Sequence, residues 1–400
     1  MTTSCDFLIV GAGIVGLTVA RELNLRHPLS KIIILEKEPD IGVHASGRNS
    51  GVLHSGVYYG SDTMKAKVCS TGAARMREFA AEHGISCDRS GKVIIASNER
   101  DLVTIDRLLK NAKDNGVRAE LLDEDGVKSI EPHASPYKMG IYCPDTAVID
   151  SKAVINKLKS LLLDLGVKII FNASLREVSV SKRLVVTSVG SYSYGYFYNC
   201  AGAGADIVAR KFGHSCDYTL VPFKGIYYKL RPEKTHLVRS NIYPVPDVDL
   251  PFLGVHLTRV ISGDVYVGPT AIPAFGRENY GILQGIQFLE GLKISSELIA
   301  MYFENKQNFR LLVHVEMKKY LKPWFVSSAR KLMNELQDDD LIACDKVGIR
   351  PQLVNVKTRS LEMDYILEKG ENSLHVLNSI SPAFTSSLAF AEKIVDKAEL

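Results

Sequence analysis

Three glycines near the start of the chain have the spacing of a dinucleotide-binding motif. Gly11, Gly13 and Gly16 form G-x-G-x-x-G. In this pattern the first glycine permits a tight turn, the second lets a pyrophosphate approach, and the third lets a helix pack closely on a strand. Glu36 follows twenty residues after Gly16, where a carboxylate can bind a ribose diol and would repel a 2′-phosphate. These residues predict a dinucleotide site and disfavour NADP.

The surrounding sequence supplies the elements that must hold these glycines. The apolar residues 7–10 predict a buried parallel strand, residues 14–23 have the apolar periodicity of a helix, and residues 31–35 predict a second parallel strand that ends at Glu36. The N-terminus of the helix then faces the phosphates with free N–H groups and a partial positive charge. This ordered set of elements is much more specific than the glycines alone.

Small residues also dominate two later segments. Residues 42–59 form a long stretch without helix or strand periodicity, which is typical of a functional loop that approaches a flat ligand. Residues 199–206 (N-C-A-G-A-G-A-D) follow a predicted strand and precede a predicted helix, but they lack the third glycine. We therefore expect this second element to line the first nucleotide site.

The order of predicted elements indicates an interleaved α/β fold with an α+β insertion. Pieces typical of a nucleotide-binding domain lie at the start, middle and end of the chain, and strand-rich and helical segments separate them. The Rossmann-like domain is predicted to comprise residues 1–84, 141–215 and 340–400. The antiparallel-sheet substrate domain is predicted to comprise residues 85–140 and 216–339.

Composition and charge exclude several classes of protein. Of the 400 residues 46% are hydrophobic and 24% charged, and the net charge is +4, which is too mild to indicate nucleic-acid binding. The seven cysteines contain no C-x-x-C pair, which argues against zinc and iron–sulfur sites, and we predict no metal. The first predicted strand begins almost at residue 1, and no apolar run reaches the ~18 residues of a membrane span. We therefore expect a cytoplasmic protein without a signal peptide.

Several further motifs carry a family likeness over essentially the whole chain. They are S-G-R-N-S-G-V-L-H-S-G-V-Y-Y at 46–59, P-F-K-G at 222–225, G-V-H-L-T-R at 254–259, G-P-T-A at 268–271, G-I-R-P-Q at 348–352 and S-P-A-F-T-S-S-L-A at 381–389. With the glycine motif, they resemble the L-2-hydroxyglutarate dehydrogenase/oxidase family, whose members are FAD enzymes of the D-amino-acid-oxidase-like superfamily. Lys224 stands where that family is expected to have arginine, so the charge is kept without the rigid bidentate fork.

The resemblance implies FAD as the cofactor and a D-amino-acid-oxidase-like fold. Ser381 and Pro382 predict an N-cap and a first helical residue, and the dipole of this helix start would stabilise the anionic reduced flavin. Whether the flavin is covalently attached stays open. The residues expected to bind FAD are Gly11, Gly13, Ile14, Val15, Gly16, Glu36, Lys37, Ser46, Gly47, Asn49, Ser50, Gly51, Val52, Gly202, Ser381, Pro382, Thr385 and Ser386.

The reaction that the resemblance implies is oxidation of L-2-hydroxyglutarate to 2-oxoglutarate. A hydride leaves C2 for the flavin, and a base removes the hydroxyl proton. Histidine suits this task because its pKa lies near neutrality. Either His54, in the loop of small residues, or His256, on a predicted strand of the substrate sheet, is a candidate catalytic base.

The substrate of this reaction carries two carboxylates, which call for two cationic contacts. Arg350, Arg259 and Lys224 are the candidates, and Arg350 is also expected to take part in catalysis because it lies between a Gly-Ile pair and a proline just before the last nucleotide-domain segment. Tyr58 is expected to offer a phenol hydrogen bond to the substrate.

Two other functions stay open on the sequence. A sibling enzyme on the same fold would oxidise a secondary amine or an amino acid, such as sarcosine, glycine or a D-amino acid, and would need a clamp for only one carboxylate. A flavoprotein that acts as an assembly factor would bind FAD without turning over any small acid or amine.

A basic and apolar segment bears on the electron acceptor. Residues 310–331 combine six lysines and arginines with an apolar stripe that holds the only tryptophan, Trp324, and residues 278–337 are predicted to be mostly helical. Such a segment suits peripheral contact with the inner face of the cell membrane, and packing on its own domain is the alternative. The resembling family includes members that pass electrons to quinone, so quinone or oxygen is the expected acceptor.

Overall fold

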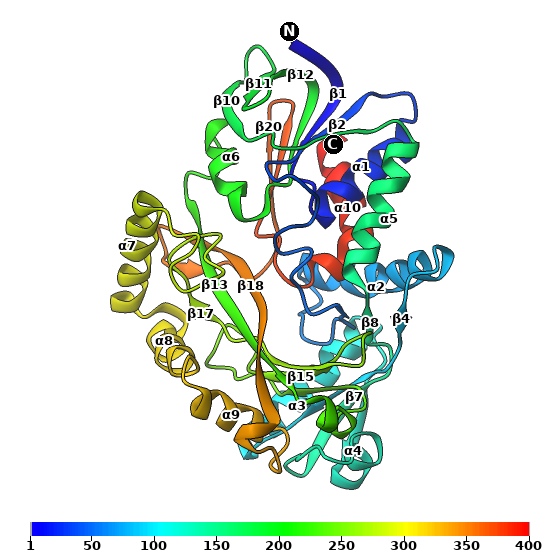
Figure 1. The fold of residues 1–400 in the computed structure, drawn as a ribbon, viewed down its shortest axis with the longest axis vertical. Coiled ribbons are helices and arrows are strands. Elements are labelled where there is room, and N and C mark those ends of the chain that lie inside the picture. Colours follow the sequence, from blue (N-terminus) through cyan, green and yellow to red (C-terminus); the bar gives the residue numbers. More distant parts are fainter. Residues whose placement is uncertain (1, 400) are drawn as a thin grey trace.

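The computed structural model describes residues 2–399, whose strands form three sheets of eight, ten and three strands. Figure 1 shows the two large sheets in separate lobes, with the glycine motif and both chain ends in the upper lobe. The long strands β13 (Tyr218–Leu230) and β18 (Leu341–Asn355) run side by side through the lower lobe and rise towards the upper one.

The eight-stranded sheet is built around β1 (Thr2–Val10), the strand that leads into the glycine motif. β1 pairs in parallel with β12 (Ser191–Asn199) on one side and β2 (Ile32–Leu35) on the other. The order β10–β11–β12–β1–β2–β9 is extended by β21, which pairs with β12, and by β20. The remaining strands are β9 (Lys168–Ile170), β10 (Leu175–Ser179), β11 (Leu184–Thr187), β20 (Ile366–Gly370) and β21 (Ser373–Leu377).

One face of this sheet is covered by α1 (Ile14–Arg26), α5 (Ser151–Asp164) and α10 (Ala383–Glu399), and α2 (Met64–Glu82) packs on α10. The backbones of α2 and α10 approach closely, since a Cβ atom at Gly72 would lie 2.5 Å from the Cα atom of Ser386. α6 (Ala205–Lys211) contacts β10, β12 and β21 of the same sheet, where Phe197 and Phe212 stack.

The ten-stranded sheet has the order β19–β18–β13–β16–β15–β14–β5–β7–β6, with β17 on β13. Its strands are β5 (Lys92–Ile95), β6 (Glu120–Asp123), β7 (Met139–Cys143), β14 (Asn241–Pro244), β15 (His256–Arg259), β16 (Val265–Gly268), β17 (Ile272–Pro273) and β19 (Ser360–Leu361), besides β13 and β18. α3 (Glu99–Asp114), α4 (Glu124–Ile130), α7 (Phe288–Glu304), α8 (Phe309–Lys318) and α9 (Lys322–Arg330) surround it, with α7 to α9 along its outer edge (Figure 1). The small sheet joins β3 (Val52–Leu53), β8 (Ala147–Ile149) and β4 (Cys87–Asp88).

The structure differs from the sequence predictions at two domain boundaries and at the start of a helical segment. The predicted boundaries at residues 141 and 340 assign most of β7 and all of β18 to the nucleotide-binding domain, but their hydrogen bonds place both strands in the ten-stranded sheet. Such long-range pairing leaves no local mark in the sequence. In the segment 278–337, helix begins only at Phe288, and the residues before it form a loop. Among residues 2–399, no helix is long and apolar enough to cross a membrane.

Candidate active site

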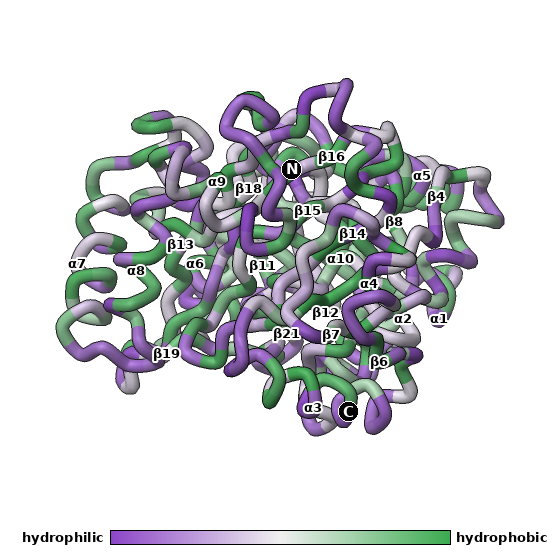
Figure 2. Tube along the Cα trace, turned by 90° about the horizontal axis from the view of Figure 1, so that it is seen from below, coloured by the Kyte–Doolittle hydropathy of each residue, from purple (hydrophilic) through white to green (hydrophobic). Residues whose placement is uncertain are grey.

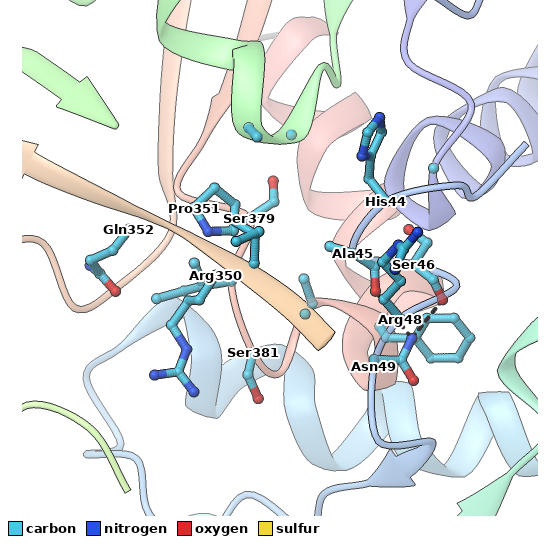
Figure 3. Close-up of a pocket in the computed structure, with 18 of the residues that line it drawn as sticks. His44, Ala45, Ser46, Arg48, Asn49, Arg350, Pro351, Gln352, Ser379 and Ser381 are labelled. Atoms are coloured by element: carbon cyan, nitrogen blue, oxygen red, sulfur yellow. Dashed lines mark hydrogen bonds between the residues drawn. The ribbon is translucent and has the colours of Figure 1, made fainter. Parts of the chain in front are cut away.

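A cavity of about 1000 Å³ reaches from the glycine motif to the strands of the ten-stranded sheet. Figure 3 shows two of its walls, with His44, Ser46 and Asn49 on one side and Arg350 and Ser381 on the other. A cavity of this size is large enough for a dinucleotide or a large cofactor together with a small substrate.

The glycine motif forms the turn that the sequence predicts. Gly11 has a φ of +102°, and a side chain there would overlap the carbonyl oxygen of Cys200, while a side chain at Gly16 would overlap the carbonyl oxygen of Gly11. Gly13 lines the cavity at the cap position of α1, and the N–H of Ile14, the first residue of the helix, donates to Oγ of Ser46 (2.9 Å). The N-terminus of α1 therefore faces the cavity, where it can stabilise a phosphate.

Glu36 is held in one orientation at the end of β2. Its Oε2 accepts a hydrogen bond from the backbone N–H of Ala12 (2.7 Å), and its Oε1 accepts one from the N–H of Glu38 (3.0 Å). The carboxylate lines the cavity next to the glycine turn. The helix start at the cavity wall and this carboxylate together fit a dinucleotide.

Most residues predicted to bind the cofactor line the cavity. They are Gly11, Gly13, Ile14, Val15, Glu36, Lys37, Ser46, Asn49, Ser50, Val52, Gly202, Ser381, Pro382 and Thr385. Gly16, Gly47, Gly51 and Ser386 do not line it and instead permit close packing behind its wall: for example, a side chain at Gly47 would overlap the carbonyl oxygen of Gly42.

The start of the last helix differs from its prediction by one residue. The backbone N–H of Ser386 donates to the carbonyl oxygen of Pro382 (2.9 Å), and helix α10 begins at Ala383, so Pro382 and not Ser381 stands at the cap position. The hydroxyl of Ser381 lies instead 3.4 Å from Nε2 of His54. Because Ser381 does not cap the helix, its hydroxyl can face the cavity that it lines.

The structure brings His54, His256, Tyr58 and Arg350 to the cavity but not Arg259 or Lys224. The guanidinium of Arg259 donates to the carbonyl oxygens of Thr235 (3.0 Å) and Val238 (3.2 Å). The ammonium of Lys224 donates to the carbonyl oxygen of Gly281 (2.6 Å). The predicted role of these two cations in binding substrate therefore has no geometric support.

Strand alternation explains both absences. Successive side chains of a strand point to opposite faces. On β15, His256 lines the cavity, so Arg259, three residues later, lies on the other face with the core residue Leu257. On β13, Phe223 and Gly225 line the cavity, and Lys224 between them does not.

The two histidines are enclosed and neutral at physiological pH. Removal from water, assisted by the charge of the nearby Lys92, lowers the pKa of His54 to about 3 and that of His256 to about 4. Nδ1 of His256 lies 2.9 Å from the carbonyl oxygen of Gly254, and the ring stacks on Tyr243 with 3.9 Å between ring centroids. His256 thus has a fixed ring orientation and a defined tautomer.

Arg350 carries a cation into the cavity from β18. It stands opposite Phe223 of β13, and its guanidinium lies 4.6 Å from the ring centroid of Phe252. Within residues 2–399 it forms no ion pair with a carboxylate, and burial lowers its pKa. An unneutralised guanidinium on a cavity wall is suited to bind a carboxylate ligand.

Sequence reasoning missed two lysines beside the site. Lys65 lines the cavity near the start of α2. Lys92 is fully buried on β5, with its ammonium 4.5 Å from the ring centroid of Tyr58 and 5.0 Å from that of Tyr243. Neither had a signal in the sequence, because each is a single lysine in an otherwise ordinary helix or strand, and only the fold brings it to the histidines or to Arg350.

A cluster at the cavity rim has the composition of a metal site. One ligand atom from each of Glu38, His44 and Glu278 lies within 4.8 Å of the others. The ammonium of Lys37 forms ion pairs with both carboxylates, at 2.6 Å from Glu278. The ammonium of Lys37 therefore already balances part of the negative charge of these acids. That the protein binds no metal stays a prediction from the sequence.

A nucleotide-binding sheet and a mostly antiparallel sheet that share one cavity fit an FAD-dependent oxidoreductase, and the family match shows that class. Residues 6–397 match the family described as DAO, FAD dependent oxidoreductase. Human mitochondrial L-2-hydroxyglutarate dehydrogenase is 34% identical over 100% of this chain and 89% of its own length. The enzyme of that name from Indibacter alkaliphilus is 34% identical over 98% of both chains. The chain therefore belongs to the L-2-hydroxyglutarate dehydrogenase family.

Solved structures of other enzymes share the fold of this chain. L-alpha-glycerophosphate oxidase from Mycoplasma pneumoniae, with FAD bound, superposes with a TM-score of 0.80 at 19% identity and covers 100% of this chain and 96% of that one. Glycine oxidase from Geobacillus kaustophilus gives a TM-score of 0.72 at 15% identity, again over 100% and 96%. The predicted fold class and the FAD cofactor are confirmed.

Proposed function

We propose that this FAD-dependent enzyme oxidises L-2-hydroxyglutarate to 2-oxoglutarate. The observation that carries the proposal is that Arg350, His54 and His256 line one cavity together with the dinucleotide-binding residues. The names of the relatives supply the substrate, and the cavity offers a cation for a carboxylate and histidines for a hydroxyl proton. When bound, the flavin accepts the hydride from C2.

His256 is the proposed base. Its Nδ1 carries the proton that is donated to the carbonyl oxygen of Gly254, so Nε2 has the free electron pair. The stacked ring of Tyr243 fixes the direction of that pair. As the hydride leaves C2, Nε2 takes the hydroxyl proton and the C2–O bond becomes a carbonyl.

His54 is proposed to hold the flavin-side loop in place. Its backbone N–H donates to Oγ1 of Thr385 (3.2 Å), and its Nε2 lies 3.4 Å from Oγ of Ser381. These contacts attach the loop of residues 42–59 to the start of α10. Tyr58 has a buried phenol oxygen without a partner among the described residues and is proposed to donate to the substrate.

The proposed substrate is tested by mixing the oxidised holoenzyme anaerobically with single substrates and following the flavin absorbance. We expect L-2-hydroxyglutarate to bleach the flavin, and its D-enantiomer, sarcosine and glycerol 3-phosphate to leave it oxidised, because only the first presents C2–H and two carboxylates in the required arrangement. Bleaching by sarcosine alone would identify an amine oxidase. A flavin that no compound bleaches would support a non-catalytic assembly factor.

We also propose peripheral membrane contact, with quinone as electron acceptor, because α7 to α9 expose apolar side chains next to basic ones. The most exposed residues of α7 are Leu289 (80%), Phe288 (77%) and Phe303 (71%), and Ile282 (90%) and Leu283 (78%) lie in the loop before it. Figure 2 shows hydrophobic stretches of α7 and α8 at one end of the molecule. The opposite faces of the helices bury Ile294, Leu312 and Phe325, so packing on the domain is already satisfied. Large exposed apolar patches with basic neighbours are typical of interfacial helices.

Vesicle flotation tests this contact. We expect the protein to float with vesicles containing phosphatidylglycerol, and the double substitution Phe288→Ser with Leu289→Ser to reduce the bound fraction about tenfold or more, because each side chain contributes ~1.5–3 kcal/mol when buried. Leu163→Ser, at a 48% exposed leucine of α5 in the other lobe, is the matched control and should float normally. Equal flotation of all three proteins would contradict the proposal.

A further inference from the structure

Lys65 places a second cation in the cavity that also holds Arg350. It is the second residue of α2, and it is 5% exposed while it still lines the cavity. Within residues 2–399 its ammonium has no carboxylate at ion-pair distance. It lies instead 5.8 Å from the ring centroid of Tyr59 and 5.6 Å from that of Tyr365, which attract a cation only weakly.

The charge of Asp364 partly offsets the effect of burial on the pKa of Lys65, but the two side chains form no ion pair among the described residues, because the carboxylate is bound by backbone N–H groups. The carboxylate of Asp364 accepts hydrogen bonds from the N–H groups of Met64 (2.6 Å), Lys65 (3.0 Å) and Tyr365 (2.8 Å). It thereby stabilises the N-terminus of α2. The ammonium of Lys65 is therefore a buried charge without an ion-pair partner among the described residues, which costs free energy.

The positions of Lys65 and Arg350 suit one ligand with two negative ends. Both side chains line the same cavity. Burial lowers the pKa of Lys65 to about 8, the charge of Asp364 opposes this shift, and the charge of Arg350 adds to it. At pH 7 both side chains are therefore cationic, and they repel each other. A dicarboxylate that spans them would neutralise both charges at once, whereas a monocarboxylate would leave one unpaired.

We propose that Lys65 binds the second carboxylate of the substrate and is the residue by which the enzyme selects 2-hydroxy dicarboxylates over monocarboxylates. This inference rests on the proposed function and assigns to Lys65 the contact that the sequence had offered to Lys224 and Arg259. Arg350 binds the carboxylate next to the reacting carbon, and Lys65 binds the distal one.

The test compares binding of glutarate and butyrate to the oxidised holoenzyme, followed by the perturbation of the flavin spectrum. Wild type should bind glutarate more tightly than butyrate. Lys65→Met should weaken glutarate binding by about 10–100-fold and leave butyrate binding within about twofold. Lys65→Arg should retain part of the preference for glutarate over butyrate, because arginine keeps the positive charge. Lys67→Met removes an exposed lysine of the same helix and should change neither constant.

Several outcomes would overturn the inference. Equal weakening of both acids, or loss of FAD from a variant with unchanged Tm, would mean that Lys65 serves the cofactor. A wild type that binds both acids equally would exclude dicarboxylate selection. Because this readout needs no turnover, it is independent of the bleaching test: an enzyme that prefers glutarate through Lys65 but is not reduced by L-2-hydroxyglutarate would refute the proposed reaction alone.

Discussion

Replacing Arg350 with methionine is expected to lower kcat/KM for L-2-hydroxyglutarate by about 10²–10³-fold, or about 3–4 kcal/mol. Methionine keeps most of the volume beside Phe252 but removes the charge and the paired N–H donors that orient the substrate carboxylate. Steady-state kinetics with purified holoenzyme measures the effect. Arg350→Lys should recover only part of the loss, because an ammonium cannot bind a carboxylate in bidentate fashion.

Two comparisons separate substrate binding from folding at this position. Arg259→Met removes a guanidinium that binds only backbone carbonyls outside the cavity, so kcat/KM should change little. In the absence of substrate, Arg350→Met should raise Tm, because it removes a buried charge that has no carboxylate partner. If Arg350→Met lowered Tm, and if Arg350→Met and Arg259→Met lowered kcat/KM by similar factors, Arg350 would be a structural residue.

Replacing His256 with glutamine is expected to slow anaerobic flavin reduction by about 10²–10⁴-fold, the usual contribution of a general base. Glutamine can still donate to the carbonyl oxygen of Gly254 but cannot take up the hydroxyl proton. His54→Gln should cost about tenfold or less, because its proposed role is to hold a loop. Stopped-flow reduction of each variant measures the rate constant, and a larger loss in the His54 variant would reverse the assignment of the base.

The low pKa of His256 also fixes the shape of the pH profile. A base acts only when deprotonated, so the reduction rate falls as the pH drops through its pKa. Burial lowers that pKa from its usual value near 6.5 to about 4. The reduction rate should therefore stay level from pH 8 to about 5 and decline only below. An acid limb centred near 6.5 would contradict an enclosed histidine base.

The parts of the site that depend on neighbouring residues were predictable from sequence. Gly11, Gly13 and Glu36 belong to one strand–helix–strand unit, whose geometry follows from local pattern and spacing. Arg350 and His256 were predicted as site residues from the sequence. Their proximity could not be predicted, because it depends on the pairing of β13 with β18 and with β16, which in turn pairs with β15. Lys65 was missed for the same reason, since α2 reaches the cavity only through packing on α10.

The position of Arg259 follows from the extent of one strand. His256 was predicted on a strand, and in the structure that strand continues to Arg259, so the two side chains, three residues apart, point to opposite faces. Lys224 is harder, because nothing in the sequence says whether odd or even residues of β13 face the cavity. The predicted start of the long helical segment was wrong, because the residues before Phe288 form a loop held by long-range contacts. In this loop Gly281 accepts a hydrogen bond from Lys224, and Glu278 forms an ion pair with Lys37.

The interleaving of the two lobes has a consequence for the order of folding during synthesis. β1 and α1 leave the ribosome before the elements on which they pack, since β1 pairs with β12, β12 pairs with β21, and α1 packs on α10. The nucleotide-binding sheet therefore cannot close until residues 373–399 have been made, almost an entire chain later. The high contact order of this arrangement favours slow, post-translational closure. A nascent chain that stops before Ser373 keeps the glycine motif but lacks the strand and helix that complete the lobe around it.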